Sequence, residues 1–306
     1  MKFGIDRLLA DPELRKPLEG KRVALLAHPA SVTAHLTHSL DALVATGLNV
    51  SAVFGPQHGV RGDLQDNMME SPDYTDPTYG MPVFSLYGEV RRPTGQSMGT
   101  FDVILIDLQD VGCRIYTFVT TLLYVLEAAA QHEKQVWVLD RPNPAGRPVE
   151  GLTLLPGWES FVGAGPMPMR HGMTLGEMGS WFIHHFGLDV DYTVIGMEGW
   201  QPETGPGFGW PPERPWINPS PNAANVNMAR AYAGTEEDPH CHASPHALRR
   251  PDRLPPLDAG RPRARRKHGG VHRPRRGGDA RDRLDRIVLR SRARHPQLSG
   301  LGLPPL

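Results

Sequence analysis

The sequence has little cysteine and no long apolar run. Cys113 and Cys241 are its two cysteines, so a disulfide framework is not expected. Apolar residues never continue for the roughly 18 positions that a membrane-spanning helix needs. The first residues carry charges between Asp6 and Glu13 and lack an apolar stretch of signal-peptide length. We therefore expect a reduced, cytoplasmic protein without a membrane partner.

Nucleotide-binding and metal-binding motifs are also missing. The chain has no G-x-G-x-x-G fingerprint, no P-loop pattern and no C-x-x-C pair, which argues against a nicotinamide or ATP enzyme. His58 and His171 lie in Gly-flanked turns, but residues 1–234 contain no H-x-H or H-x-x-x-H spacing. We therefore predict no metal site and no cofactor, and a metal-dependent hydrolase is the less favoured alternative.

Aromatic residues are absent from the last part of the chain. All 22 Phe, Trp and Tyr precede position 233. Residues 1–234 contain 16 Lys+Arg and 25 Asp+Glu, whereas residues 235–306 contain 17 and 8. A stretch with 16 arginines, 10 prolines and no aromatic ring cannot bury enough apolar surface to offset its chain entropy. We predict that residues 235–306 form a largely disordered Arg/Pro-rich tail.

Three origins of this tail are open. A basic arm that binds nucleic acid fits its charge, and an ordinary flexible tail fits its composition. Out-of-frame translation of a GC-rich gene yields Arg, Pro, Ala, Gly and His and depletes Phe, Tyr, Asn and Lys. The composition of residues 235–306 favours the third origin, so no nucleic-acid partner is predicted.

The first 165 residues alternate between strand and helix patterns. Apolar runs predict strands at residues 22–27, 50–54, 82–87, 101–108 and 135–140, and helical spacing predicts helices at 38–46 and 116–131. This alternation is typical of an α/β fold with a doubly wound parallel sheet. A second, smaller α/β unit is predicted from residue 166, where the Thr174–Glu177 capping box opens a helix and a strand and an irregular segment follow.

Polar, turn-rich loops follow three of the predicted strands. They are residues 55–63 (GPQHGVRGD), 109–116 (QDVGCRIY) and 140–147 (DRPNPAGR). Ligands of open parallel sheets bind beyond the carboxyl ends of the strands, so these loops predict a site. Asp110 follows a buried strand and is a candidate general acid with a raised pKa. Alternatively, it caps the next helix or pairs with Arg114.

Arginine and asparagine recur around the predicted crevice. The four arginines are Arg61, Arg114, Arg141 and Arg170. Guanidinium groups bind carboxylates through two hydrogen bonds, which favours an anionic or polyhydroxylated substrate. Salt bridges to nearby carboxylates are the other interpretation. Asn143 and Asn222 in Pro-flanked turns suit sugar hydroxyls, and they equally suit Asx turns.

Seven motifs occur together in one order. They are GPQHGVRGD, PVFSLYG, DVILIDLQDVGCRIYTF, VLDRPNPAGRPVEG, SFVG, MRHGMTLGE and PSPN. In this order, across roughly residues 20–234, they resemble the exo-β-N-acetylmuramidase family of peptidoglycan-cleaving glycoside hydrolases. The resemblance implies a Rossmann-like domain at 1–165, the beginning of an auxiliary domain at 166–234, and an active site between the two.

The resemblance also implies an activity and a set of site residues. Family members remove N-acetylmuramic acid from the non-reducing end of peptidoglycan-derived glycan fragments, which are therefore the expected partner. The arginines then suit the lactyl carboxylate of the sugar. The positions implied as substrate-binding are Arg61, Arg114, Tyr116, Arg141, Asn143, Arg170, His171 and Asn222, and Gln57 and His58 fall in the catalytic motif.

The chain departs from the family pattern at position 57. Family members commonly have P-E-H-G, and this glutamate is their proposed catalytic carboxylate, whereas here Gln57 precedes His58. Gln57 cannot transfer the proton that glycoside hydrolysis requires. Glu70 and Asp110 are the candidate replacements, and Gln57 is left to hold a hydroxyl or the 2-acetamido group. A non-catalytic protein that binds amino sugars is the alternative function.

The second departure gives a test of the tail. Where the family continues with E-G-T-x-x-S-E-G-R-G-T-T, this chain reads EEDPHCHASPHALRR. We hypothesise a frameshift near Thr235. Sequencing the gene across codons 225–245 should show that a shifted frame restores the family sequence. A DNA sequence that encodes the tail only in the present frame would contradict the hypothesis.

Overall fold

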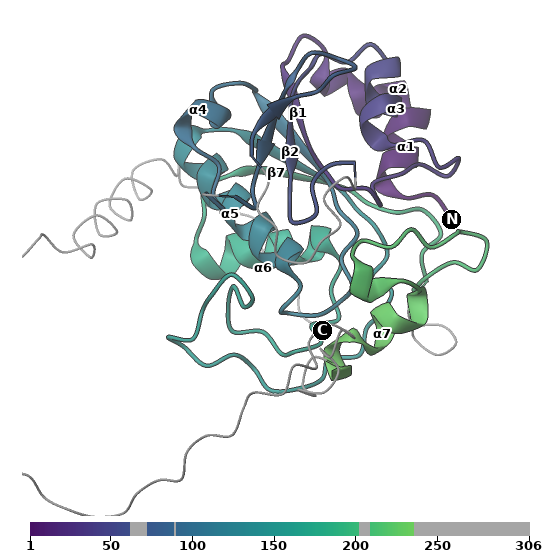
Figure 1. Cartoon of the computed structure of the whole chain (residues 1–306), viewed down its shortest axis with the longest axis vertical. Helices are drawn as coiled ribbons and strands as arrows, with labels where there is room; N and C mark the ends of the chain where they lie inside the picture. The colour runs from purple at the N-terminus through teal and green to yellow at the C-terminus, as the bar shows by residue number, and fades with distance from the viewer. Residues whose placement is uncertain (62–71, 89, 202–208, 236–306) are drawn as a thin grey trace, which may run out of the picture. The chain divides into compact units, whose positions relative to one another are not determined.

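A computed structural model describes residues 1–61, 72–88, 90–201 and 209–235 (Figure 1). The described strands form a seven-stranded sheet in the order β3-β4-β2-β1-β5-β6-β7. Their bounds are β1 Val23–Ala27, β2 Val50–Gly55, β3 Tyr74–Thr75, β4 Pro82–Ser85, β5 Val103–Asp107, β6 Gln135–Leu139 and β7 Asp191–Ile195. Neighbouring strands are parallel except for the short β3, which is antiparallel to β4.

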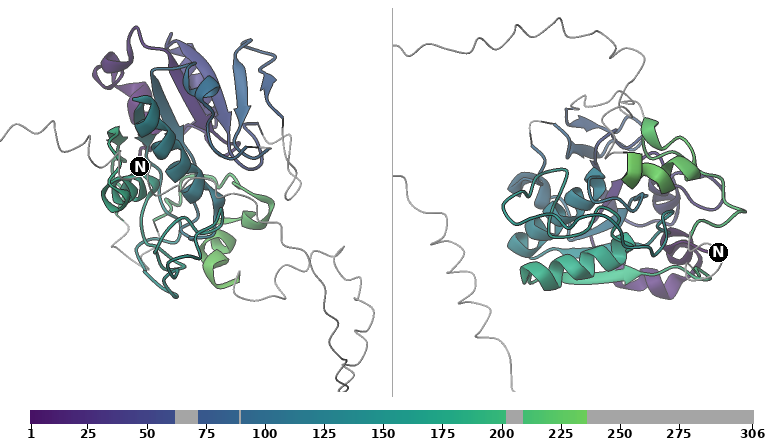
Figure 2. Two further views of the ribbon diagram at one scale, coloured as in Figure 1. Left: turned by 90° about the vertical axis from the view of Figure 1, so that its left-hand side faces the viewer. Right: turned by 90° about the horizontal axis from the view of Figure 1, so that it is seen from below.

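Helices cover both faces of the sheet (Figures 1 and 2). The first face packs against α1 (Gly4–Ala10) and α3 (Ser39–Ala45), and the second packs against α4 (Gly95–Met98), α5 (Thr117–His132) and α6 (Leu175–Phe186). The remaining elements are α2 (Pro12–Arg15), η1 (Lys16–Leu18), η2 (Pro221–Ala223) and α7 (Val226–Thr235).

Alternation along β1 shows why the sheet needs two apolar layers. Val23 and Leu25 belong to the core on the α1/α3 side, whereas Ala24 and Leu26 belong to the core on the α5 side. Successive side chains of a strand point to opposite faces, so a strand covered on both faces must be apolar throughout. All five residues of β1 and of β5 are buried.

The predicted fold class is confirmed, and the predicted strands and helices recur within a few residues. Three details differ. The strand expected at residues 82–87 ends at Ser85, and the segment expected to be irregular contains α7. In addition, β7 pairs with β6 in register from Gln135–Asp191 to Leu139–Ile195. Residues 166–195 therefore extend the first sheet, and the boundary expected after residue 165 does not separate them from it.

The tail predicted for residues 235–306 lies, beyond Thr235, outside the described residues. Within the described ranges, none of the helices combines the length and apolarity needed to cross a bilayer.

Asp140 fixes the start of α6 at the end of β6. Its carboxylate accepts hydrogen bonds from the Thr174 hydroxyl (2.8 Å) and the Gly176 amide (3.0 Å). Thr174 and Glu177 form the capping box expected from the sequence. Glycine is required at 176 because a Cβ there would lie 2.7 Å from a Val194 methyl and 3.0 Å from the Asp140 carboxyl carbon.

Burial raises the pKa of Asp140 to about 6. Because this pKa is higher in the folded than in the unfolded chain, the stability linked to it is complete at low pH and is lost as the pH rises to about 6. The shift corresponds to about 3 kcal/mol. In Asp140→Asn, the amide oxygen still accepts from Gly176 and its nitrogen donates to Thr174. We therefore expect the stability of D140N relative to wild type to rise by up to about 3 kcal/mol between about pH 4 and pH 7.

Urea unfolding at several pH values measures this difference. Asp189 is exposed, so Asp189→Asn is the matched control for the loss of one carboxyl group. Equal pH profiles for the two variants would contradict the assignment.

Candidate active site

The carboxyl ends of the parallel strands bring the predicted loops to one edge of the sheet. Gln57 and His58 follow β2, Asp110 follows β5, and Arg141 follows β6. The sheet order places β2, β1, β5 and β6 side by side. This edge is where the crevice of an open parallel sheet is expected.

The turn after β2 carries backbone strain. His58 (φ 75°) and Gly59 (φ 72°) are both left-handed, and the Gly59 amide donates to the Pro56 carbonyl at 3.0 Å. A non-glycine residue in this region costs about 1 kcal/mol or more and is concentrated at functional sites. The turn leaves Gln57 and His58 half-buried, with the Nδ1 atom of His58 in the interior.

Gln57 is held at the N-terminus of α5. The Thr117 hydroxyl donates to Gln57 Oε1 at 2.9 Å. Thr117 is the first residue of this 16-residue helix, and Tyr116 precedes it as the N-cap without a side-chain capping bond. The partial positive charge of a helix N-terminus favours negatively charged or electron-rich groups at this point.

Asp110 and His171 meet in the interior. His171 Nε2 lies 3.3 Å from Asp110 Oδ2, and the two residues are 3% and 4% exposed. Asp110 Oδ2 also accepts a hydrogen bond from the Gly112 amide at 2.7 Å, and the Asp110 carbonyl accepts from Gln109 Nε2 at 2.8 Å. Asp110 Oδ1 has no hydrogen-bond partner within the described residues. Asp110 therefore neither caps α5 nor pairs with Arg114.

Tyr116 is buried beside Asp110. Its ring packs edge-on against Phe118 (4.9 Å) and against Tyr232 of α7 (5.6 Å between ring centres). Burial raises the pKa of Tyr116 far above its usual value, and its hydroxyl faces that of Ser220. The Tyr116 ring is thus covered in part by Tyr232 of α7, and the Asp110 side chain is buried.

Arg141 forms a buried ion pair with Asp107. Arg141 Nε and Nη2 donate to the two Asp107 carboxylate oxygens at 2.5 and 2.9 Å, and their side chains are 3% and 0% exposed. The Ser39 hydroxyl donates to the same carboxylate, and Arg141 Nη2 also donates to the Val32 carbonyl at 2.9 Å. The pair joins the ends of β5 and β6 to the loop after β1.

The other three arginines also have protein partners. Arg61 pairs with Asp41 at 2.9 Å on the surface. Arg114 donates to two backbone carbonyls at 2.7 and 2.8 Å, those of Leu152 and Met167. Arg170 pairs with Glu150 at 2.6 Å and donates to the Arg230 carbonyl at 3.0 Å. The four guanidinium groups therefore do not converge as one open cluster, and their role toward a substrate stays a prediction.

Of the remaining predicted residues, Asn143 has the geometry of the Asx-turn alternative. Its side chain accepts from the Ala145 amide (2.9 Å) and donates to the Met173 carbonyl (3.0 Å), and it is 1% exposed. Asn222 is exposed in η2. Glu70 lies outside the described residues.

Two further residues of this edge were not among the predicted site residues. His28 directly follows β1 and is 1% exposed, with Nδ1 accepting from the Ala30 amide at 3.1 Å. Burial and the nearby charge of His58 hold the pKa of His28 well below its usual value, so it is neutral. Thr117 is the second. The signal for His28 was available, since a polar residue immediately after a buried strand marks the carboxyl edge, but nothing local marks Thr117.

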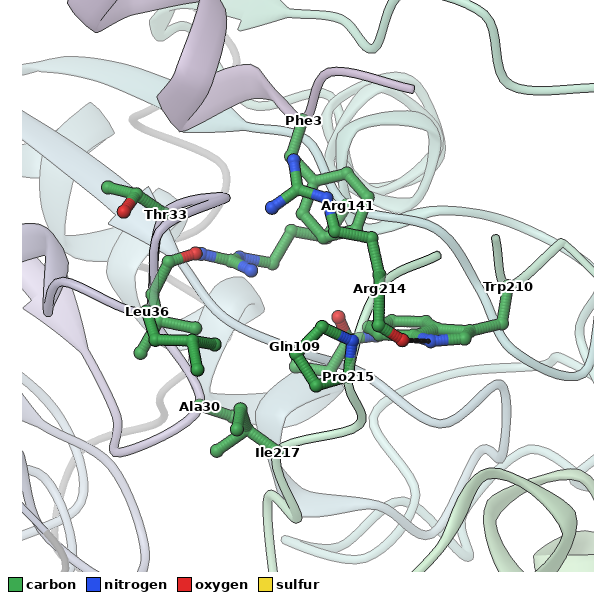
Figure 3. Close-up of a pocket in the computed structure, with 11 residues that line it drawn as sticks. Phe3, Ala30, Thr33, Leu36, Gln109, Arg141, Trp210, Arg214, Pro215 and Ile217 are labelled. Atoms are coloured by element: carbon green, nitrogen blue, oxygen red, sulfur yellow. Dashed lines mark hydrogen bonds between the residues drawn. The ribbon is translucent and has the colours of Figure 1, made fainter. Parts of the chain in front are cut away.

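A small cavity lies next to Arg141 (Figure 3). It is bounded by parts of the chain that are far apart in sequence, which are Phe3, Ala30, Val32, Thr33, Leu36, Gln109, Arg141, Trp210, Arg214, Pro215 and Ile217. Its free interior of about 10 Å³ holds roughly one water molecule. A sugar ring does not fit there. A second, open pocket of about 480 Å³ lies between α1 and the loop after β1, with Asp6 and His35 among its lining residues. The half-buried turn at Gln57 is a separate part of the carboxyl edge.

Gly95–Gly99 reads G-x-S-x-G, a pattern found in serine hydrolases. Here it forms the short helix α4 instead of a strand-to-helix elbow. Ser97 is 2% exposed, and its hydroxyl donates to the Thr94 carbonyl at 3.0 Å. This serine is a capping residue and is not a nucleophile.

The sheet topology and the loops at the carboxyl ends of its strands define a doubly wound α/β protein. Its candidate site lies beyond those strand ends. Residues 23–227 match the family described as exo-beta-N-acetylmuramidase NamZ, N-terminal. The chain belongs to this family, as its motifs predicted.

Individual relatives support the same family assignment. Peptidoglycan beta-N-acetylmuramidase NamZ of Bacillus subtilis (strain 168) is 42% identical over 235 residues, which are 76% of this chain and 55% of that protein. Two crystal structures of DUF1343 family proteins from Bacteroides fragilis NCTC 9343 have TM-scores of 0.66 and 0.64 at 35% and 31% identity. The matched regions cover 77% and 76% of this chain, and 60% of the chain in each of the two crystal structures. The chain spans about half the length of the curated relative it matches.

The Asp107–Arg141 pair gives a stability test. Arg141→Ala leaves the fully buried Asp107 carboxylate without its partner, which should cost about 3–5 kcal/mol of unfolding free energy. Lys2→Ala removes the exposed pair with Glu198 and should cost less than about 1 kcal/mol. Urea unfolding of both variants measures the difference, and equal losses would show that the buried pair is not the stronger constraint.

Proposed function

We propose that this chain acts as an exo-β-N-acetylmuramidase, a glycosidase that releases N-acetylmuramic acid from the non-reducing end of peptidoglycan fragments. The observation that carries the proposal is the strained turn with Gln57 and His58 at the carboxyl edge, in a chain that belongs to the NamZ family. The Bacillus subtilis relative bears the name of this activity.

Position 57 restricts the chemistry that this chain performs. Glycoside hydrolysis needs an acid to protonate the leaving oxygen and a second group on the opposite face of the sugar. The amide of Gln57 supplies neither a proton nor a negative charge. Among the described residues, we propose the Asp110 carboxyl group as the acid. It follows β5 at the carboxyl edge, and its Oδ1 has no hydrogen-bond partner in the described ranges.

Asp110 acts only when the side chains that cover it move. It is 4% exposed and close enough to Tyr116 for its charge to act on that hydroxyl, and Tyr116 packs against Tyr232 of α7. We propose that His171, whose Nε2 faces Asp110 at 3.3 Å, orients this carboxyl group. The proposed substrate is a peptidoglycan fragment, and we retain the cytoplasm as the proposed location.

A chromogenic N-acetylmuraminide tests the function directly. We expect the purified chain to hydrolyse it, and Asp110→Asn to lower kcat by about 100-fold or more, because general acid catalysis contributes on the order of 10²–10⁴. Matched controls are the corresponding N-acetylglucosaminide, which lacks the lactyl group, and Asp189→Asn, which changes an exposed carboxyl.

Two outcomes would contradict the proposal in different ways. Tight binding of the muraminide without turnover would identify an amino-sugar binding protein. Unchanged turnover by Asp110→Asn would place the acid at another residue.

A further inference from the structure

Resting on the proposed function, we infer that Thr117 is a positioning residue that turns the amide nitrogen of Gln57 toward the substrate, where it binds the acetamido carbonyl of the sugar. Nothing in the sequence marks Thr117 for this role. The inference starts from one hydrogen bond, in which the Thr117 hydroxyl donates to Gln57 Oε1 at 2.9 Å.

The first turn of α5 explains the direction of this bond. A threonine inside a helix often donates its hydroxyl proton to the carbonyl of the residue four positions before it. For Thr117 that residue is Cys113, whose carbonyl already accepts from the Tyr116 amide at 3.0 Å. The Thr117 hydroxyl donates to Gln57 Oε1 instead, so the amide oxygen has a protein partner.

The other end of the Gln57 amide is consequently the end that faces a ligand. Within the described residues, Gln57 Nε2 makes no hydrogen bond, and the side chain is half-buried at the end of the strained turn. A side-chain amide has two N–H donors on its nitrogen. Position 57 therefore presents donors to the crevice, where a glutamate would present acceptors.

Donors at this position select an acceptor on the substrate. An N-acetylated amino sugar carries one amide carbonyl, which is its strongest neutral hydrogen-bond acceptor. A fixed amide donor recognises this carbonyl without any charge, and fixing it beforehand lowers the entropy lost on binding. Thr117 thus acts on affinity through Gln57 and does not touch the reacting atoms.

Three threonine variants test the role by steady-state hydrolysis of the chromogenic N-acetylmuraminide. Thr117→Val should raise KM about 3- to 10-fold at nearly unchanged kcat, since a neutral hydrogen bond contributes about 0.5–1.5 kcal/mol. Thr117→Ser keeps the hydroxyl and should retain the wild-type KM. Thr120→Val makes the same chemical change one turn further on, at a buried hydroxyl without a hydrogen-bond partner in the described residues, and should leave KM unchanged.

Gln57→Glu adds a second measurement, the pH dependence of KM. Thr117 would not affect this pH dependence if its role were purely structural. As a carboxylate, this side chain has no N–H, so KM should rise as the pH rises through the pKa of the new carboxyl group. The Thr117 hydroxyl stabilises the carboxylate. Adding Thr117→Val to Q57E should therefore move that inflection to higher pH, and adding Thr117→Ser should not.

The outcomes separate this inference from the proposed function. If the wild type hydrolyses the muraminide and Thr117→Val behaves like Thr120→Val, the inference fails and the function stands. If kcat of Q57E rises as its new carboxyl group ionises, position 57 is a catalytic site and not a donor site. If the wild type neither hydrolyses nor binds the muraminide in a calorimetric titration, both fail. Thermal unfolding of each variant checks that a changed KM does not come from an unfolded fraction.

Discussion

The buried Asp107–Arg141 ion pair holds the carboxyl edge of the sheet together. A carboxylate at 0% exposure is tolerated only with a charged and hydrogen-bonded partner. The guanidinium of Arg141 satisfies both carboxylate oxygens and also reaches the Val32 carbonyl. The loops that follow the neighbouring strands β1, β5 and β6 are therefore fixed relative to one another, and Asp110 lies on the one after β5.

The edge has an exposed part and a buried part. Gln57 and His58 reach the surface on a strained turn, whereas Asp110 and His171 face each other at 3–4% exposure. In the proposed function, a sugar binds at the turn and Asp110 is the proposed acid, so the buried side chains around Asp110 would have to move before it reaches the sugar.

Sequence periodicity was enough to predict the sheet, because strands buried on both faces must be apolar throughout, as β1 and β5 are. Periodicity also predicted the carboxyl edge of the sheet, because it showed where these buried strands end and the polar loops begin. It did not predict which polar side chains would be neutralised by neighbours: the partners of Arg141 and Arg170 lie 34 and 20 residues away, at Asp107 and Glu150. Thr117 was likewise invisible, since its contact with Gln57 spans 60 residues.

The most direct test of the account is a crystal structure of the protein with N-acetylmuramic acid. We predict that the sugar lies at the turn after β2, with Gln57 Nε2 within hydrogen-bond distance of the acetamido carbonyl, Thr117 still bonded to Gln57 Oε1, and the Asp107–Arg141 pair unbroken. A sugar bound away from this turn, or a Gln57 side chain that offers its oxygen to the ligand, would contradict it.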